Sequence, residues 1–251
     1  MLHLRSLAGV AAGLLIAGTA SAGTLGPATA PNLGLSLRWG PTGTENAWTG
    51  SASGVTDPSG TDFDYTGSVV KTSWTINWNA VADPDPLVNG TFSVTNSTAF
   101  TQTFILTVTL PVSPAIPGAA FVSGSVGGSV SDGTTLGSPA VGQSGSTPFF
   151  VGLVDGATAL SLTPILPATC TSPTPAGPPC TASIGTTSGG PLTVGSGPLS
   201  DIGIRLQFTL TPGDVAAVTA AFNVVPVPEP ATVVLLGFGL TGLMVAGRRR
   251  S

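Results

Sequence analysis

Histidine is almost missing from this sequence: its only copy among the 251 residues is His3, close to the N-terminus. A folded domain without histidine holds no Ser-His-Asp triad, no Cys-His pair and no histidine-based metal site. Lysine is equally rare, with Lys71 as its single copy, and no glycine-rich phosphate-binding loop is present. The commonest nucleophilic, metal-dependent and nucleotide-binding sites are therefore excluded, and no catalytic residue and no metal ligand set is assigned.

Positive charge is scarce between the two ends of the chain. Residues 23–225 contain three basic side chains, Arg38, Lys71 and Arg205, against ten acidic ones. Proteins bind nucleic acid largely through lysine and arginine contacts with phosphates, so nucleic acid is excluded as a partner. The same charge balance disfavours binding to an anionic membrane surface.

The N-terminus has the three parts of a secretory signal peptide. A short basic start is followed by an apolar stretch from Leu7 to Ala17 and by a small-residue cleavage site at Ala20 and Ala22. Signal peptidase is therefore an expected partner, and residues 1–22 are expected to be removed. An uncleaved anchor is the alternative, which the two alanines disfavour.

The C-terminus combines a Pro-Glu-Pro segment, an apolar run and a basic cluster. Pro228, Glu229 and Pro230 precede an uncharged run over 231–247, and Arg248, Arg249 and Arg250 follow it. At about 1.5 Å per residue, that run forms a helix of roughly 25 Å, near the lower limit for crossing a bilayer. Because arginines resist translocation, we expect a transmembrane helix with its C-terminal end in the cytoplasm. A buried C-terminal helix is the alternative, but core helices rarely lack a polar face.

This ordered combination resembles the ends of PEP-CTERM proteins, which are sorted by exosortases. The resemblance rests on Pro228-Glu229-Pro230, the apolar run, the arginine cluster and the signal peptide. It implies that residues 226–251 are a sorting and anchor segment, and that an exosortase in the inner membrane cuts near the Pro-Glu-Pro segment. It also implies that the domain, transiently anchored, ends at the cell surface or outside the cell. The family occurs in Gram-negative bacteria that make exopolysaccharide, often in biofilms, and its members share this tail but differ in the domain.

Alternating apolar and polar residues dominate residues 23–225, as is typical of half-buried strands. Expected strands are Leu33–Trp39, Val70–Trp78, Thr91–Thr95, Phe104–Leu110, Ala120–Val126, Phe149–Val154, Ala157–Leu162, Ile202–Leu210 and Val218–Val225. Asp155-Gly156 is a strong two-residue hairpin signal, and Pro111 is expected to end its strand. Eight or more strands without intervening helices predict an all-β fold, an antiparallel two-layer β-sandwich.

The same alternation predicts the core. The residues expected inside are Trp74, Ile76, Trp78, Phe92, Phe104, Leu106, Val108, Ile204, Leu206 and Phe208. Two regions, 123–147 and 170–191, are so rich in glycine, serine or proline that we expect loops joining short strands. Residues 212–217 offer the only short helical possibility.

The two cysteines, Cys170 and Cys180, are the only ones in the chain. Two cysteines this close in an exported protein are expected to form a disulfide, which stabilises by a few kcal/mol when it closes a loop of about ten residues. A metal site is disfavoured because further ligands are missing. Paired cysteines also leave no thiol nucleophile.

Carboxylates offer two weaker site hypotheses. A glycosidase cleft needs two carboxylates across the scissile bond, and four acids fall in one loop-rich stretch: Glu45, Asp57, Asp62 and Asp64. The last three, or alternatively Asp83 and Asp85, are candidate oxygen ligands for calcium. Their spacing is not that of an EF-hand, and a role in forming turns is the favoured interpretation for all of them.

Tryptophan and asparagine suggest two further sites. Trp48 is flanked by small and polar residues, so it is the tryptophan expected to be exposed and to stack on a sugar ring. Trp74 and Trp78 share a face with core residues and are expected to pack inside. Asn89 and Asn96 each begin a glycosylation sequon, although a role in turns is favoured for both.

Together these observations favour an exported, exosortase-sorted protein with a non-enzymatic structural or adhesive β-sandwich. The runner-up is a module that binds carbohydrate, namely exopolysaccharide, which predicts an exposed aromatic platform. The third hypothesis is a carboxylate glycosidase, which predicts two acids facing each other in a cleft. No cofactor is expected apart from the calcium alternative.

Overall fold

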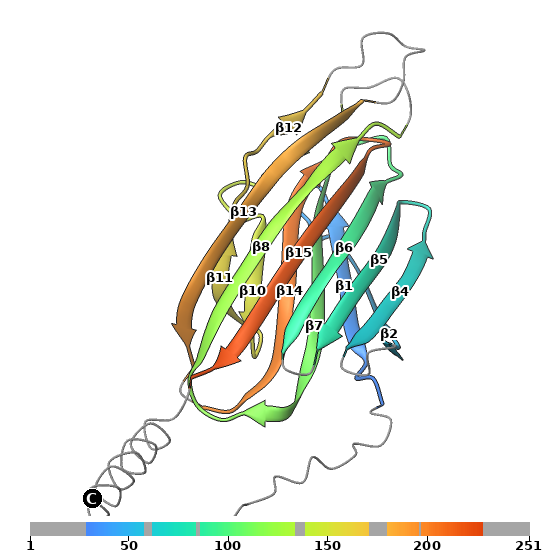
Figure 1. Cartoon of the computed structure of the whole chain (residues 1–251). Coiled ribbons are helices and arrows are strands. Elements are labelled where there is room, and N and C mark those ends of the chain that lie inside the picture. Colours follow the sequence, from blue (N-terminus) through green and yellow to red (C-terminus); the bar gives the residue numbers. More distant parts are fainter. Residues whose placement is uncertain are drawn as a thin grey trace, which may run out of the picture.

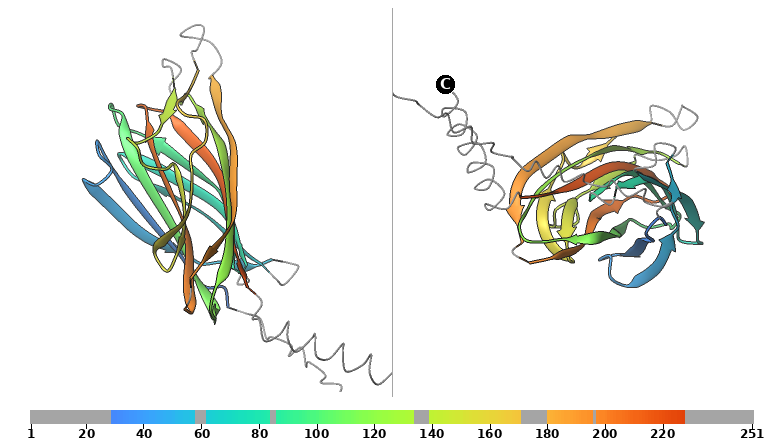
Figure 2. Two further views of the ribbon diagram at one scale, coloured as in Figure 1. Left: turned by 90° about the vertical axis from the view of Figure 1, so that its left-hand side faces the viewer. Right: turned by 60° about the horizontal axis from the view of Figure 1, so that its bottom comes forward.

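The computed structural model describes residues 29–57, 62–83, 86–133, 139–170, 180–195 and 197–227. These residues form two antiparallel sheets packed face to face (Figure 1, Figure 2), which confirms the predicted all-β two-layer sandwich. Within those ranges no helix is found, and hence none that is long and apolar enough to cross a membrane. The predicted signal peptide, Pro-Glu-Pro segment, apolar run and arginine cluster all lie outside the described residues.

The eight-stranded sheet combines strands from most of the domain. Its main order is β11 (Ala157–Leu162), β10 (Phe150–Val154), β14 (Leu199–Leu210), β7 (Gln102–Ile116), β1 (Leu33–Gly40) and β2 (Asn46–Ala52). Two short strands complete it: β9 (Ala140–Gly142) pairs with β14, and β12 (Ala168–Thr169) pairs with β9.

The seven-stranded sheet lies opposite. Its order is β13 (Thr181–Val194), β8 (Ala120–Ser131), β15 (Val215–Pro226), β6 (Leu87–Asn96), β5 (Trp74–Asp83), β4 (Phe63–Val70) and β3 (Val55–Thr56). The last strand in the sequence, β15, lies inside this sheet and pairs with β8 on one side and β6 on the other. The strand that leads toward the Pro-Glu-Pro segment is therefore held on both sides.

The core lies between the sheets and matches its prediction. All ten residues expected inside are buried, with exposed fractions of 9% or less. Alternate residues point inward in most of the long strands, as in β15, where the buried side chains are Ala216, Val218, Ala220, Phe222 and Val224. Full burial of each large apolar side chain contributes about 1.5–3 kcal/mol. Burial of these inward-pointing side chains is therefore the main driving force for packing the two sheets together.

The hairpin at Asp155-Gly156 is also confirmed. Both residues have positive φ angles, 48° and 72°, as a type I′ turn between β10 and β11 requires. The strand predicted over Val70–Trp78 is wrong in its limits. Val70 ends β4 and is 71% exposed, and Lys71 N donates to Trp74 O (2.8 Å) to close a tight turn before β5 begins.

Pro111 does not end its strand, contrary to the prediction. β7 continues to Ile116, and Pro111 lies opposite Asp201, where the register of β14 shifts between Leu199 and Asp201. Proline lacks the N–H that a regular ladder needs, and such irregular positions tolerate that loss. The possible helix at 212–217 is likewise absent, because Pro212-Gly213 makes a turn and β15 begins at Val215.

The two regions expected to be mainly loops contain long strands instead. β8 and β13 pair along most of their length, and both are rich in glycine and serine. Close packing of backbones explains why glycine is needed here: a Cβ on Gly128 would lie 2.2 Å from Ala217 O of the neighbouring strand. β2 and β4 were not expected either.

Candidate functional site

Trp48 is not the exposed platform that the sequence predicts. It lies half-buried on β2, and its ring centroid is 5.6 Å from that of Trp74. Trp39 also packs on Trp74, with the two ring centroids 5.3 Å apart. The Trp48 ring also covers Gly50, where a Cβ would lie 2.5 Å from it. The four tryptophans are therefore all buried or half-buried parts of the core, as expected for Trp74 and Trp78 alone.

Glu45 is committed to a turn rather than to a cleft. In the connection between β1 and β2 its carboxylate accepts hydrogen bonds from Thr42 Oγ1 (2.6 Å), Thr42 N (3.0 Å) and Thr44 N (3.0 Å). These donors, above all the Thr42 hydroxyl, lower the pKa of Glu45 to about 2. A general acid needs a raised pKa, so this environment does not suit that role.

The three aspartates proposed for calcium lie around the β3–β4 hairpin. Asp57 N donates to Asp62 O (2.9 Å), and Asp64 is exposed on β4, opposite Val55. Among the described residues, no group of three or more His, Cys, Asp or Glu side chains is placed to hold a metal ion. The calcium hypothesis therefore finds no support, and the favoured turn interpretation fits Asp57 and Asp62. Asp83 ends β5, and Asp85 lies outside the described residues.

The two sequon asparagines have opposite environments. Asn96 is fully buried, donating from Nδ2 to Phe100 O (2.8 Å), Leu210 O (2.9 Å) and Thr211 O (3.1 Å). Its Oδ1 accepts from Thr98 N (3.0 Å) and Thr98 Oγ1 (2.8 Å). Asn96 thus organises the loop after β6, as a turn role predicts. Asn89 is exposed on β6, within a strand rather than a turn.

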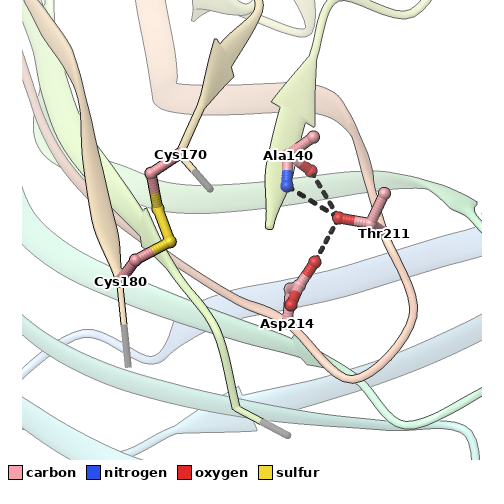
Figure 3. Close-up of a disulfide and its surroundings, with 5 residues drawn as sticks. All are labelled: Ala140, Cys170, Cys180, Thr211 and Asp214. Carbon is pink, nitrogen blue, oxygen red and sulfur yellow. Dashed lines mark hydrogen bonds between the residues drawn. A yellow bond between two sulfur atoms is a disulfide. The ribbon is translucent and has the colours of Figure 1, made fainter. Parts of the chain in front are cut away.

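The predicted disulfide is present between Cys170, just after β12, and Cys180, just before β13 (Figure 3). It joins a short strand of the eight-stranded sheet to the edge strand of the other sheet. Close by in Figure 3, the hydroxyl of Thr211 contacts both Ala140 and the carboxyl of Asp214.

A buried pair of acids at this end of the sandwich was missed by the sequence reasoning. Asp132 and Asp214 are only 5% and 2% exposed. Burial raises the pKa of Asp214, and the nearby Asp132 carboxylate raises it further, whereas the Thr211 hydroxyl opposes the shift. In the sequence these acids follow a serine-rich strand and a Pro-Gly turn, so only burial distinguishes them from ordinary turn residues.

The outer face of the seven-stranded sheet carries a regular array that we call the hydroxyl face. Two rows of side chains cross strands β4, β5, β6, β15, β8 and β13 in register: Ser68, Asn77, Ser93, Ala217, Ser129 and Ser183, then Thr66, Asn79, Thr91, Thr219, Gly127 and Thr186. Thr91 and Thr219 share a hydrogen bond of 3.1 Å between their hydroxyls. All of these positions are exposed or half-buried except Gly127, which has no side chain and is buried.

Charge is missing from most of this face. The four consecutive strands β6, β15, β8 and β13 contain no charged residue, and β4 and β5 contain only Asp64 and Asp83. Neighbouring strands lie about 4.8 Å apart, and side chains on one face repeat about every 6.7 Å along a strand. The result is a grid of neutral hydroxyl and amide groups.

The C-terminal end of β15, at Pro226, leads out of the domain. Pro226 still pairs with Ala120, and Val227 N donates to Ala119 O (3.0 Å). Pro228, the first residue of the Pro-Glu-Pro segment, follows directly.

Comparison with known protein families identifies the C-terminal end of the chain. Residues 226–250 match the family description "PEP-CTERM protein-sorting motif". The match begins at the final residue of β15. No curated protein matches the chain.

Proposed function

We propose that the sandwich is a non-enzymatic structural or adhesive domain. Residues 226–250 carry the PEP-CTERM protein-sorting motif, which indicates an exosortase-sorted exported protein that passes through a membrane-anchored state. Its place is the cell surface or the extracellular matrix, where it contacts hydrated polysaccharide. In this proposal residues 1–22 are removed by signal peptidase, 23–225 form the working domain, and 226–251 are the sorting and anchor segment. The apolar run 231–247 spans the inner membrane, and Arg248–Arg250 hold its cytoplasmic end.

The observation that carries the proposal is the hydroxyl face. Neutral hydroxyl and amide groups exchange hydrogen bonds with sugar hydroxyls, each with a net contribution of about 0.5–1.5 kcal/mol. A single contact is weak, but the rows of Thr, Ser and Asn present many at once to a repeating polymer. The absence of charge on four strands also avoids repelling polymers of either sign.

The competing functions have less support. An aromatic carbohydrate platform would need an exposed ring, and Trp48 packs on Trp74 instead. A glycosidase would need a proton-donating acid beside a second carboxylate in a cleft, whereas Glu45 is held as an anion by its own turn.

The test is binding of the mature exported protein to neutral polysaccharide gels by affinity electrophoresis. The variant Thr91→Val/Thr219→Val removes two central hydroxyls at nearly constant shape and is expected to weaken retardation at least threefold. Thr107→Val is the matched control, because Thr107 lies on β7 of the other sheet, between Ser36 and Arg205. Equal retardation of the wild type and the double variant would contradict the proposal.

A further inference from the structure

The fold holds the chain until it reaches the sorting motif. Val224 N donates to Pro86 O (3.0 Å), Pro226 pairs with Ala120, and Val227 is fixed by its hydrogen bond to Ala119. The Pro-Glu-Pro segment consists of the three residues that follow Val227 in the sequence, and three residues extend at most about 11 Å. Any enzyme that binds the Pro-Glu-Pro segment must therefore approach this end of the sandwich closely.

That end presents an apolar surface, which we call the exit surface. It contains a hollow of about 440 Å³ whose lining residues include Pro86, Pro114, Ile116, Pro117, Val225 and Pro226. Beside it, Val225 pairs with Phe121 across β15 and β8, and the two side chains remain 48% and 40% exposed. In Figure 1 the ends of β7 and β15 and the start of β8 lie together at the lower end of the molecule.

We propose that the exit surface is the docking site for the exosortase that processes this protein. This inference rests on the sorting motif in the proposed function, and it adds a second contact to the recognition of the motif itself. Apolar side chains left exposed beside a processing site are typical of surfaces that bind a protein. A contact here raises the effective concentration of the adjacent motif in the enzyme's active site.

A protein suits this surface better than lipid headgroups. None of the residues lining the hollow is charged. Among the described residues, Asp83 at the end of β5 pairs with Leu87 next to Pro86, and its side chain is acidic. Anionic headgroups attract basic segments, and neither the lining of the hollow nor the Phe121–Val225 pair supplies one.

The first experiment follows processing of the full chain in cells that contain a functional exosortase. The variant Phe121→Ser/Val225→Ser is expected to slow conversion to the released form at least fivefold, equivalent to about 1 kcal/mol. Phe100→Ser is the matched control. Phe100 is 74% exposed and lies in the loop that follows β6. That end of β6 pairs with Val215, the first residue of β15, so Phe100 lies at the other end of β15 from the exit surface. A wild-type rate for the double variant, or equal slowing by the control, overturns the proposal.

A second experiment separates docking from obstruction. Eight glycine and serine residues inserted between Val227 and Pro228 move the motif away from the exit surface. If the surface docks the enzyme, the insertion slows processing, and Phe121→Ser/Val225→Ser then has little additional effect. Faster processing after insertion would mean that the folded end merely obstructs the enzyme, and the proposal would be wrong.

The reaction in detergent identifies the occupant. With purified exosortase and full-length protein in micelles, a persisting difference between wild type and double variant supports direct docking. Loss of the difference assigns the surface to the bilayer, and a difference that depends on substrate concentration assigns it to a second copy; either result overturns the proposal. Phe121 and Val225 share the outer face of their strands with the hydroxyl face, but Val225 lies six residues, roughly 20 Å, beyond Thr219 along β15. Binding of the double variant to polysaccharide is therefore measured as well and should remain unchanged, which separates a failure of this proposal from a failure of the proposed function.

Discussion

Replacing Asn96 with alanine is expected to destabilise the sandwich by about 3–5 kcal/mol. The Asn96 side chain is fully buried on β6 of one sheet and donates to the carbonyl of Leu210, the last residue of β14 in the other sheet. It also holds the loop after β6 through Thr98 and Phe100. One amide therefore connects two sheets and a loop.

The magnitude follows from the hydrogen bonds that are lost. Asn96 Nδ2 shares its two hydrogens among three carbonyls, and Oδ1 accepts two further bonds, so about four hydrogen bonds contribute about 1 kcal/mol each. Solvent can reach the partly buried Phe100 and Thr98 groups and recover part of that loss, whereas the bond to Leu210 is buried. The loss is a large part of the typical 5–15 kcal/mol of domain stability.

Urea unfolding of the mature protein measures the effect. With an m-value of about 2 kcal/mol/M, the midpoint should fall by about 2 M. Asn89→Ala is the matched control, because Asn89 begins the other sequon on the same strand but is exposed; we expect a change within about 0.5 kcal/mol. A loss below about 1 kcal/mol for Asn96→Ala would refute the reasoning that this network stabilises the fold.

Two further predictions concern acids. The pKa of Asp214 is raised in the folded state, so the stability of the wild type should fall as the pH rises from the usual carboxyl value through the folded pKa. Thermal melting across pH 4–8 should show a smaller fall for Asp214→Asn. A variant with the same pH profile as the wild type would contradict this prediction. Asp155 accepts from Ser200 N (2.7 Å), Ser200 Oγ (2.9 Å) and Asp201 N (3.1 Å), which lowers its pKa. Asp155→Ala should therefore destabilise the folded domain by about 1–2 kcal/mol at pH 7, and by less as the pH falls below the usual carboxyl value. Denaturant unfolding at pH 7 and at pH 3 measures both effects. A loss of stability that does not depend on pH would argue against a role of the carboxylate.

The strands with regular alternation were predictable because local pattern and burial agree. From Ile202 to Leu210, every second residue of β14 is a large apolar one, and the Asp155-Gly156 turn needs only two residues to be identified. β8 was predicted only as far as Val126, and β13 was missed, because glycine normally weakens strands. Here Gly128 is required by the approach of Ala217, a residue that only the fold brings close.

The sites were less predictable than the strands because their partners are distant in sequence. Trp48 looks exposed from its small neighbours, but Trp74 of the opposite sheet covers it. Asn96 reads as a turn residue, yet it bonds to Leu210 across the sandwich. By contrast, the disulfide and the sorting motif depend on residues close together in the chain, and both predictions were confirmed.

The position of β15 has a consequence for the timing of folding during export. A chain that crosses the membrane from its N-terminus delivers β15 last among the strands that the structure describes, yet β15 lies between β8 and β6. Until Val215–Pro226 has emerged, β13 and β8 have no connection to the rest of their sheet. The seven-stranded sheet can therefore close only after the residues directly before the sorting segment have crossed the membrane, so the fold is completed as the membrane-anchored state begins.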